Sequence, residues 1–160
     1  MEMGKVSEIS TENEIRINRA IDYIVGHLEE PLSLEILAEV SCFSKFHFHR
    51  LFKQVTGESV NQFIKRQRMQ RAFLLLTCRQ SIPITEIAQQ CGYSSISNFS
   101  KAFSAYFHLP PTQVREDFHF HAFKRYASIV QEKYASHPFR QVINERMMNF
   151  FQSDYRPVIG

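Results

Sequence analysis

The chain carries one pattern of residues twice, about fifty positions apart, and this duplication constrains its fold more than any other feature. In each copy a short apolar stretch with one small alanine leads into a turn. A second run follows, in which apolar residues recur at the i, i+3, i+4, i+7 spacing of a helix that buries one face. The matching positions are Leu34 and Ile84, Leu37 and Ile87, Ala38 and Ala88, Phe43 and Tyr93, Ser44 and Ser94, and, after one inserted residue, Phe48 and Phe99, Arg50 and Lys101, and Phe52 and Phe103. The pattern predicts two copies of one small helical unit.

Local signals predict a helix, a tight turn and a second helix in each copy. Gly92 can adopt a positive φ in the second turn without a steric cost. Ser44 and Ser94 precede the second helices, and we expect their hydroxyls to cap these helices by accepting hydrogen bonds from backbone N–H groups. The helices are placed near 34–41 and 45–55 in the first copy, and near 84–90 and 95–107 in the second.

Further helices are predicted around the two copies. An amphipathic helix covers about 14–28. A long helix over roughly 60–77 follows Gly57, which suits the end of the preceding helix, and Ser59, which suits a cap. Pro111 begins a short helix that runs to about Asp117. We expect an all-α protein with a flexible N-terminus (1–13), a first helix-turn-helix unit (14–58), a linker helix (59–78), a second helix-turn-helix unit (79–117) and a C-terminal helical extension (118–160).

The C-terminal extension lies outside the duplication. It carries a strongly apolar stripe over 139–151, after a break at Pro138. Such a stripe has to be covered, since each large side chain that is buried stabilises by about 1.5–3 kcal/mol. Three outcomes stay open: the stripe packs on the chain's own units, which we favour, forms a dimer interface, or binds an effector or partner.

Charge is distributed unevenly along a chain whose net charge is only +3. The second helix of the first copy, from Lys45 to Lys53, contains no acid, and neither does the segment from Lys65 to Arg71. The acidic residues Glu29, Glu30, Glu35 and Glu39 are expected on helices that face away. A helix with an apolar inner face and a basic outer face suits the major groove of double-stranded DNA.

The second copy resembles the DNA-binding domain of the AraC/XylS family of bacterial transcription regulators. The residues that carry this resemblance are Ile84, Ile87, Ala88, Cys91, Gly92, Tyr93, Phe99, Phe103, Phe107, Pro110, Pro111 and Arg115. The double proline, and Gly57 with Ser59 after the first copy, look most like the MarA/SoxS/Rob branch. The resemblance covers roughly residues 14–116 and leaves 118–160 unaccounted for.

The resemblance implies that each unit inserts its second helix into a major groove. The base-reading candidates are Phe46, His49 and Arg50 in the first unit, and Ile96, Ser97, Asn98 and Lys101 in the second. Further DNA contacts are expected from Lys45, Lys53, Lys65, Arg66 and Ser95. Because the units repeat head to tail, we expect one monomer to bind an asymmetric site, with RNA polymerase as a possible partner.

This sequence departs from the family pattern at a few positions. Cys42 stands where the first turn usually has glycine, Phe46 stands where the branch has tryptophan, and Ile96 stands where a polar residue would read a base. Phe46 and Ile96 each allow two interpretations, as core residues or as exposed groups that meet a thymine methyl.

Other classes of protein find little support. The three cysteines form no CxxC pair and favour reduced thiols in a cytoplasmic protein. The His47-x-His49 and His119-x-His121 pairs are poor metal sites, because residues i and i+2 of a helix point apart. We expect no cofactor, no membrane span and no enzyme activity. The competing interpretation is a helical adaptor that docks on a protein such as RNA polymerase and binds DNA weakly.

Overall fold

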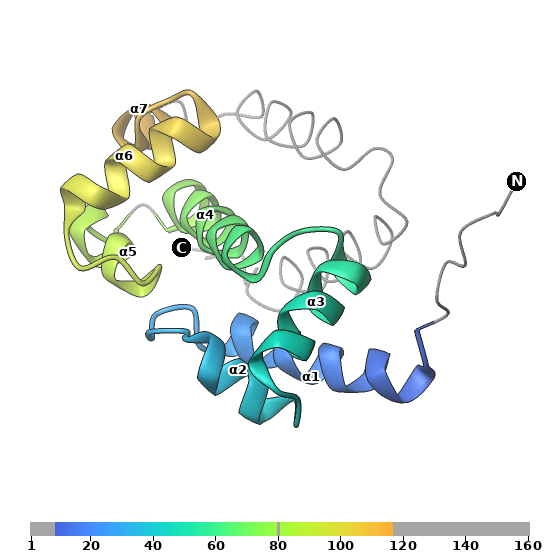
Figure 1. Cartoon of the computed structure of the whole chain (residues 1–160). Coiled ribbons are helices and arrows are strands. Elements are labelled where there is room, and N and C mark those ends of the chain that lie inside the picture. Colours follow the sequence, from blue (N-terminus) through green and yellow to red (C-terminus); the bar gives the residue numbers. More distant parts are fainter. Residues whose placement is uncertain (1–8, 80, 117–160) are drawn as a thin grey trace, which may run out of the picture. The chain divides into compact units, whose positions relative to one another are not determined.

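The computed structural model describes residues 9–79 and 81–116, and all regular secondary structure in these ranges is helical (Figure 1). The all-α fold class is therefore confirmed. The apolar stripe over 139–151 and the rest of the predicted extension lie outside the described residues. The helices are α1 (Thr11–Gly26), α2 (Leu34–Val40), α3 (Lys45–Thr56), α4 (Val60–Cys78), α5 (Ile84–Gln90), α6 (Ile96–Phe107) and α7 (Pro111–Glu116).

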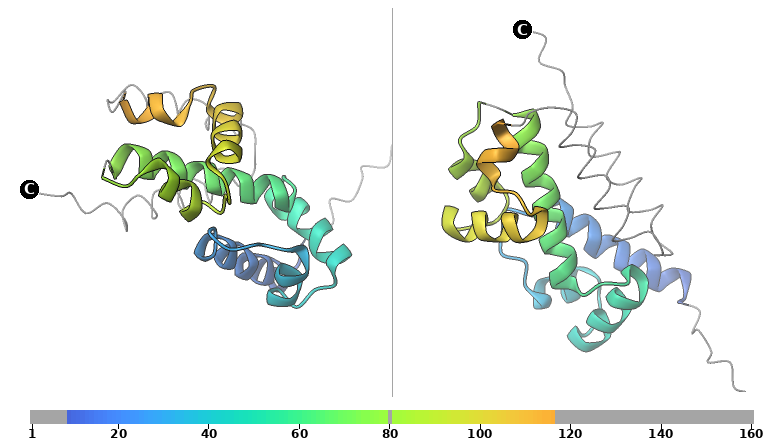
Figure 2. Two further views of the ribbon diagram at one scale, coloured as in Figure 1. Left: turned by 90° about the vertical axis from the view of Figure 1, so that its left-hand side faces the viewer. Right: turned by 90° about the horizontal axis from the view of Figure 1, so that it is seen from above.

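The chain divides into two compact units, and the boundary falls inside α4, between Gln67 and Arg68. Helix α4 is continuous across this boundary (Figure 2). Its first part therefore belongs to the unit that contains α1, α2 and α3, and its second part to the unit that contains α5, α6 and α7.

The first unit buries one face of each of its helices. The buried residues of α1 follow the i, i+3, i+4, i+7 spacing expected of an amphipathic helix. Aromatic rings then join α3 to the start of α4, since Phe52 lies 5.6 Å from Phe48 and 5.3 Å from Phe63 between ring centroids. The buried set is Ile17, Ala20, Ile21 and Ile24 of α1, Leu37 and Ala38 of α2, and Phe48, Leu51, Phe52 and Val55 of α3.

The second unit is built around a row of phenylalanine rings. Phe99, Phe103 and Phe107 of α6 follow one another at centroid distances of 5.8 and 4.6 Å, and Phe107 meets Phe73 of α4 at 5.2 Å. Burial of such rings is the largest source of stabilisation in a domain of this size. The rest of the core is Met69, Ala72, Leu76, Ile87, Ala88, Cys91 and Val114.

The duplication extends further than the sequence pattern indicated. Each unit opens with a helix whose buried residues have the same spacing: Ile17, Ala20, Ile21 and Ile24 in α1, and Met69, Ala72, Phe73 and Leu76 in α4. An arginine comes directly before each set, Arg16 in α1 and Arg68 in α4. The second part of α4 is therefore the counterpart of α1.

The caps explain where the helices begin. Ser44 caps α3 as predicted, since its hydroxyl accepts from the His47 N–H at 3.4 Å. The prediction of Ser94 as the second cap is wrong. Ser95 has the extended backbone of a cap, and its hydroxyl accepts from the Asn98 N–H at 3.1 Å. The inserted residue of the second copy therefore lies before the cap, and α6 begins at Ile96.

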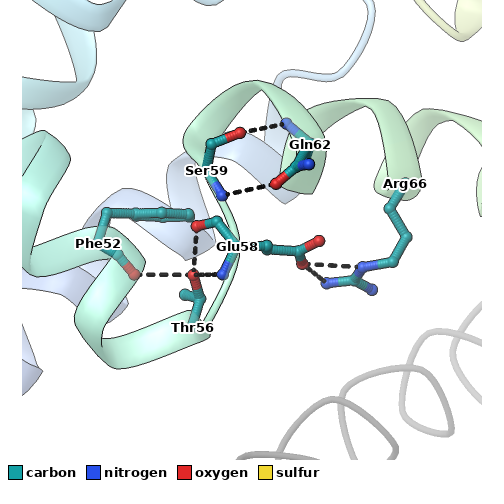
Figure 3. A network of polar contacts seen from close by, with 6 residues as sticks. All are labelled: Phe52, Thr56, Glu58, Ser59, Gln62 and Arg66. Carbon is teal, nitrogen blue, oxygen red and sulfur yellow. Dashed lines mark hydrogen bonds and ion pairs between the residues drawn. The ribbon is translucent and has the colours of Figure 1, made fainter. Parts of the chain in front are cut away.

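Helix α4 begins with a reciprocal cap. The Ser59 hydroxyl accepts from the Gln62 N–H at 3.2 Å, and the Gln62 side-chain oxygen accepts from the Ser59 N–H at 3.1 Å (Figure 3). The prediction of Ser59 as the cap is confirmed.

The turn inside each unit is a Schellman motif. In the first unit the Phe43 N–H donates to the Ala38 carbonyl at 2.9 Å and the Cys42 N–H to the Glu39 carbonyl at 3.0 Å. The second unit repeats this pattern, from Tyr93 to Ala88 and from Gly92 to Gln89, at 3.0 Å each. The residue in the left-handed conformation is Cys42 (φ 58°) in one turn and Gly92 (φ 82°) in the other.

Both recognition-helix candidates, α3 and α6, also end on a left-handed residue. Gly57 (φ 78°) donates its N–H to the Lys53 carbonyl at 2.7 Å, as predicted for the end of that helix. His108 (φ 58°) donates to the Ser104 carbonyl at 2.8 Å. Each unit thus has one glycine and one other residue at its two left-handed positions.

Candidate nucleic-acid interface

The outer face of α3 is basic and aromatic. The helix contains no acid. Its exposed residues include every predicted contact of the first unit, namely Lys45, Phe46, His49, Arg50 and Lys53. The apolar residues of α3 hold this face outward, because they fill the unit's core on the opposite side of the helix. The chemistry of the face is that of a surface that meets phosphates and base edges.

Phe46 is 92% exposed, in the first turn of α3. This value decides between the two interpretations of the residue, since a core side chain would be covered. A large aromatic ring left in water at this position is available to stack or to contact a thymine methyl. Ile96, in the first turn of α6, is 45% exposed and is likewise not a core residue.

Lys45 is held by an acid that was expected to face away. Its Nζ lies 2.6 Å from Oε1 of Glu35 on α2. The hydrogen bond and charge of Lys45 keep the pKa of the Glu35 carboxyl below its usual value. The sequence missed this pair because ten residues and a turn separate the partners. A carboxylate therefore lies beside the basic face of α3 and forms an ion pair with Lys45.

The outer face of α6 has a different chemistry. Ser97, Asn98 and Lys101 are exposed beside Ile96, and Lys101 is the only charged residue of this helix. Ser95 is half-buried and its hydroxyl is engaged as the cap. Each unit therefore exposes one face of its second helix after the same kind of turn. The exposed face is strongly basic in α3 and mostly neutral in α6.

Arg66 is not available to a phosphate, and the prediction that it binds one is wrong. Its side chain is 1% exposed. The Nε and Nη2 atoms donate to Oε1 of Glu58 at 3.0 and 2.7 Å (Figure 3). The guanidinium carbon also lies 4.9 Å from the centroid of the Phe63 ring. Phe63, Arg66, Gln70 and Phe73 are all buried and follow a helical spacing, which is the signal that could have placed Arg66 inside.

The other basic residues of α4 differ in exposure. Lys65 is exposed, while Arg68 and Arg71 are half-buried. Burial lowers the pKa of Arg68, against the opposing influence of the neighbouring Tyr93 and Cys91 groups. Among the four cations of this helix segment, Lys65 alone is exposed, while Arg66 is buried.

Arg16 on α1 belongs to the site, although the sequence did not single it out. Its Nε donates to the Ser41 carbonyl at 2.9 Å, and its Nη2 donates to the Cys42 carbonyl. Its guanidinium lies over the Phe43 ring, 3.8 Å from the centroid. Arg16 therefore holds the turn that leads into α3. The equivalent position of Arg68 in the duplication is the signal that could have found it.

The cysteines are not alike. Burial raises the pKa of the Cys91 thiol to about 12, which leaves it protonated and unreactive, as a small apolar core residue. Cys42 and Cys78 are exposed. In the ranges that the structure describes, no group of three metal-ligating side chains comes together, and no helix is both long and apolar enough to cross a membrane.

Two helix-turn-helix units that share α4 and present their second helices outward define a tandem helix-turn-helix class of DNA-binding fold. Residues 37–117 match a family described as "Helix-turn-helix domain". The chain is also similar to the multiple antibiotic resistance protein MarA of Escherichia coli. The two are 37% identical over 101 residues, which cover 63% of this chain and 79% of MarA.

Solved structures agree. The C-terminal domain of AraT, a response regulator of Geobacillus stearothermophilus, has a TM-score of 0.61 at 33% identity, over 69% of this chain and 88% of that domain. The DNA-binding domain of AdpA, a global transcriptional factor solved in complex with a target DNA, has a TM-score of 0.61 at 25% identity, over 64% and 92%. The chain belongs to the AraC/XylS family of DNA-binding transcription regulators. This membership agrees with the expectation that it is not an enzyme.

Proposed function

We propose that one copy of this chain binds an asymmetric duplex site by placing α3 and α6 in successive major grooves. The outer face of α3 carries the proposal, since it combines three basic residues with a ring that is 92% exposed and contains no acid. Helix α4 has 19 residues, or about 28 Å, and successive grooves on one face of DNA lie about 34 Å apart. A helix of this length suits a connection between two half-sites.

The residues of α3 divide into base and phosphate contacts. Arg50 is exposed in the middle of the helix and has the planar fork that pairs with guanine O6 and N7. Phe46 lies one turn before Arg50, His49 lies directly before it, and the two complete the base-reading set. Lys45, Lys53 and Lys65 are point charges that suit phosphates.

The second unit contributes fewer strong contacts. Ser97, Asn98, Lys101 and Ile96 supply its base-reading surface, and Ser95 can add a phosphate contact from the cap. Short polar side chains reach fewer base edges than arginine does. We expect the half-site read by α6 to tolerate more sequences than the half-site read by α3.

The first test is selection of bound duplexes from a random pool, followed by titration over a range of salt. If six to ten phosphates are neutralised, the affinity falls by about 10³–10⁵ between 50 and 200 mM salt. Sedimentation of the complex checks that a single copy is bound. An adaptor that docks on RNA polymerase and binds DNA only weakly would select no sequence from the pool.

Arg50→Ala tests the base contact, with Lys65→Ala as its matched control. The first change costs about 1–3 kcal/mol at one base pair and relaxes specificity there. The second weakens every duplex alike and reduces the salt dependence by about one counterion. Equal loss on all duplexes for Arg50→Ala makes its role a phosphate contact.

A further inference from the structure

Cys42 is the point of the first unit where the backbone is least favourable. It has φ 58° in the turn between α2 and α3, a conformation that residues other than glycine adopt rarely. The corresponding turn of the second unit has Gly92, for which the same conformation carries no steric penalty. A turn with a cysteine here therefore needs contacts that hold it, or α3 loses its fixed direction.

Arg16 provides these contacts. It donates to the carbonyls of both Ser41 and Cys42, which lie on either side of the backbone dihedrals of Cys42. Two donors of one planar guanidinium bind consecutive carbonyls, so neither peptide can rotate without breaking a hydrogen bond. These hydrogen bonds come from α1, which packs in the core through Ile17 and Ala20.

The same arginine also reaches the start of α3. Its guanidinium is stacked on Phe43, and the Phe43 ring meets the His47 ring edge-on at 5.1 Å. His47 lies in the first turn of α3, next to Phe46. Arg16 thus connects the core of the unit with the turn and with the helix that we propose to read the bases.

We propose that Arg16 is a positioning residue for DNA recognition by the first unit, holding Cys42 in its left-handed conformation and so fixing the direction of α3. This inference rests on the proposed function of α3. Arg68 takes the equivalent place beside Tyr93 and Cys91 of the second turn. Because Gly92 needs no support, the second unit depends less on its arginine.

The test combines Arg16→Gln with Cys42→Gly, and uses Arg19→Gln as a control. Arg19 is an exposed cation on the same helix. On the selected duplex, Arg16→Gln lowers affinity roughly ten-fold. This factor is the ratio by which a residue with a Cβ disfavours the left-handed conformation once nothing holds it there. Arg19→Gln lowers it by about two-fold at most. Cys42→Gly in the Arg16→Gln background restores affinity to within about two-fold of Cys42→Gly alone, because glycine adopts the turn unaided.

Three results overturn the proposal. If Arg19→Gln costs as much as Arg16→Gln, the effect is one of general charge. If Cys42→Gly does not rescue, Arg16 acts elsewhere, and a salt dependence that stays lower by about one counterion makes it a phosphate contact. If Arg16→Lys binds as tightly as the unchanged chain, the forked geometry is not needed. Circular dichroism of each variant checks that the helices remain.

The same variants separate this inference from the proposed function. Failure of the unchanged chain to bind any duplex refutes the proposed function alone. The coupling of Arg16 with Cys42 is still measured by denaturant unfolding. There Arg16→Gln shifts the unfolding equilibrium at least about three-fold more with Cys42 than with glycine at that position. If the effects of Arg16→Gln and Cys42→Gly on the unfolding equilibrium are additive, Arg16 does not support the turn, whether or not the chain binds DNA.

Discussion

The two units have the same backbone conformation at their turns and helix ends. They differ in which of these positions has a residue other than glycine, for which the left-handed conformation costs free energy. Both make a Schellman turn before the outward helix and a left-handed ending after it. The first unit has cysteine in the turn and glycine at the ending, whereas the second has glycine in the turn and histidine at the ending. The hydrogen-bonding pattern therefore sets the conformation, and the residue at each position decides how much support the conformation needs.

The segments that follow the outward helices differ more. After α3, a buried ion pair between Glu58 and Arg66 ties the connection to α4, and the Thr56 hydroxyl donates to the Phe52 and Glu58 carbonyls at 2.7 and 3.0 Å (Figure 3). After α6, Leu109 packs on the core and two prolines lead into α7. One unit closes with a polar network and the other with apolar side chains.

Glu58→Ala gives the largest expected effect. It leaves the guanidinium of Arg66 buried without its carboxylate, which costs about 3–5 kcal/mol in the free energy of unfolding. Hydrogen exchange should show the loss in α3 and in the first part of α4, while α5 and α6 keep their protection. The exposed Glu39→Gln serves as a control and changes stability by about 0.5 kcal/mol at most.

A double change tests whether the polar closure is needed at all. Glu58→Leu with Arg66→Met gives the first unit the apolar closure of the second, and restores or raises stability relative to Glu58→Ala. If Glu58→Ala alone is harmless, the ion pair is not what closes the unit, and the contrast between the two closures fails.

Exchange of residues at the left-handed positions gives a smaller effect, whose sign depends on whether a glycine is removed or introduced. Gly92→Ala costs about 1–2 kcal/mol, because it places a Cβ at φ 82°. Cys42→Gly and His108→Gly each stabilise by about 0.5–1 kcal/mol, after allowance for the greater freedom of glycine in the unfolded chain. Denaturant midpoints at constant slope measure these changes. If both glycine variants lose stability, the side-chain contacts of Cys42 and His108 stabilise the fold by more than their left-handed conformation costs.

The smallest effect concerns the acid beside α3. Glu35→Gln removes a negative charge next to the proposed phosphate path and releases Lys45. DNA affinity should rise a few-fold at low salt, and the gain should shrink as salt screens it. Glu86→Gln on α5 is the control in the second unit: Glu86 is an exposed acid that accepts from the Gln90 side chain at 3.1 Å, and no ion pair with it is found among the described residues. If Glu35→Gln and Glu86→Gln raise DNA affinity equally, the effect comes from the net charge of the chain and not from the position of Glu35.

The sequence predicted the elements well because they are encoded locally. Apolar spacing, capping serines and the helix-starting Pro111 placed each helix to within a few residues, and Gly57 and Gly92 marked two left-handed positions. The polar outer face of α3 followed directly, because its buried face was known.

What the sequence missed depends on partners that are distant along the chain. Arg66 was read as one of a basic run, because Glu58 on the preceding connection gives no periodic signal. Arg16 meets its carbonyls 25 and 26 residues later. Ser94 and Ser95 are equivalent as sequence, and only the extended backbone of Ser95 makes it the cap. Single side chains were therefore harder to place than helices.

The proposed contact of the exposed Phe46 ring with DNA has a consequence for the temperature dependence of binding. A phenylalanine side chain covers about 150–250 Å² when buried. Removal of apolar surface from water lowers the heat capacity by about 0.45 cal/mol/K per Å². A ring that is 92% exposed in the free protein would contribute roughly −0.1 kcal/mol/K to the heat-capacity change of binding if the duplex covers it as proposed. The serine at the matching place in α6, Ser97, has almost no apolar surface to contribute, so we expect the binding enthalpy of the proposed first half-site to vary more steeply with temperature than that of the second.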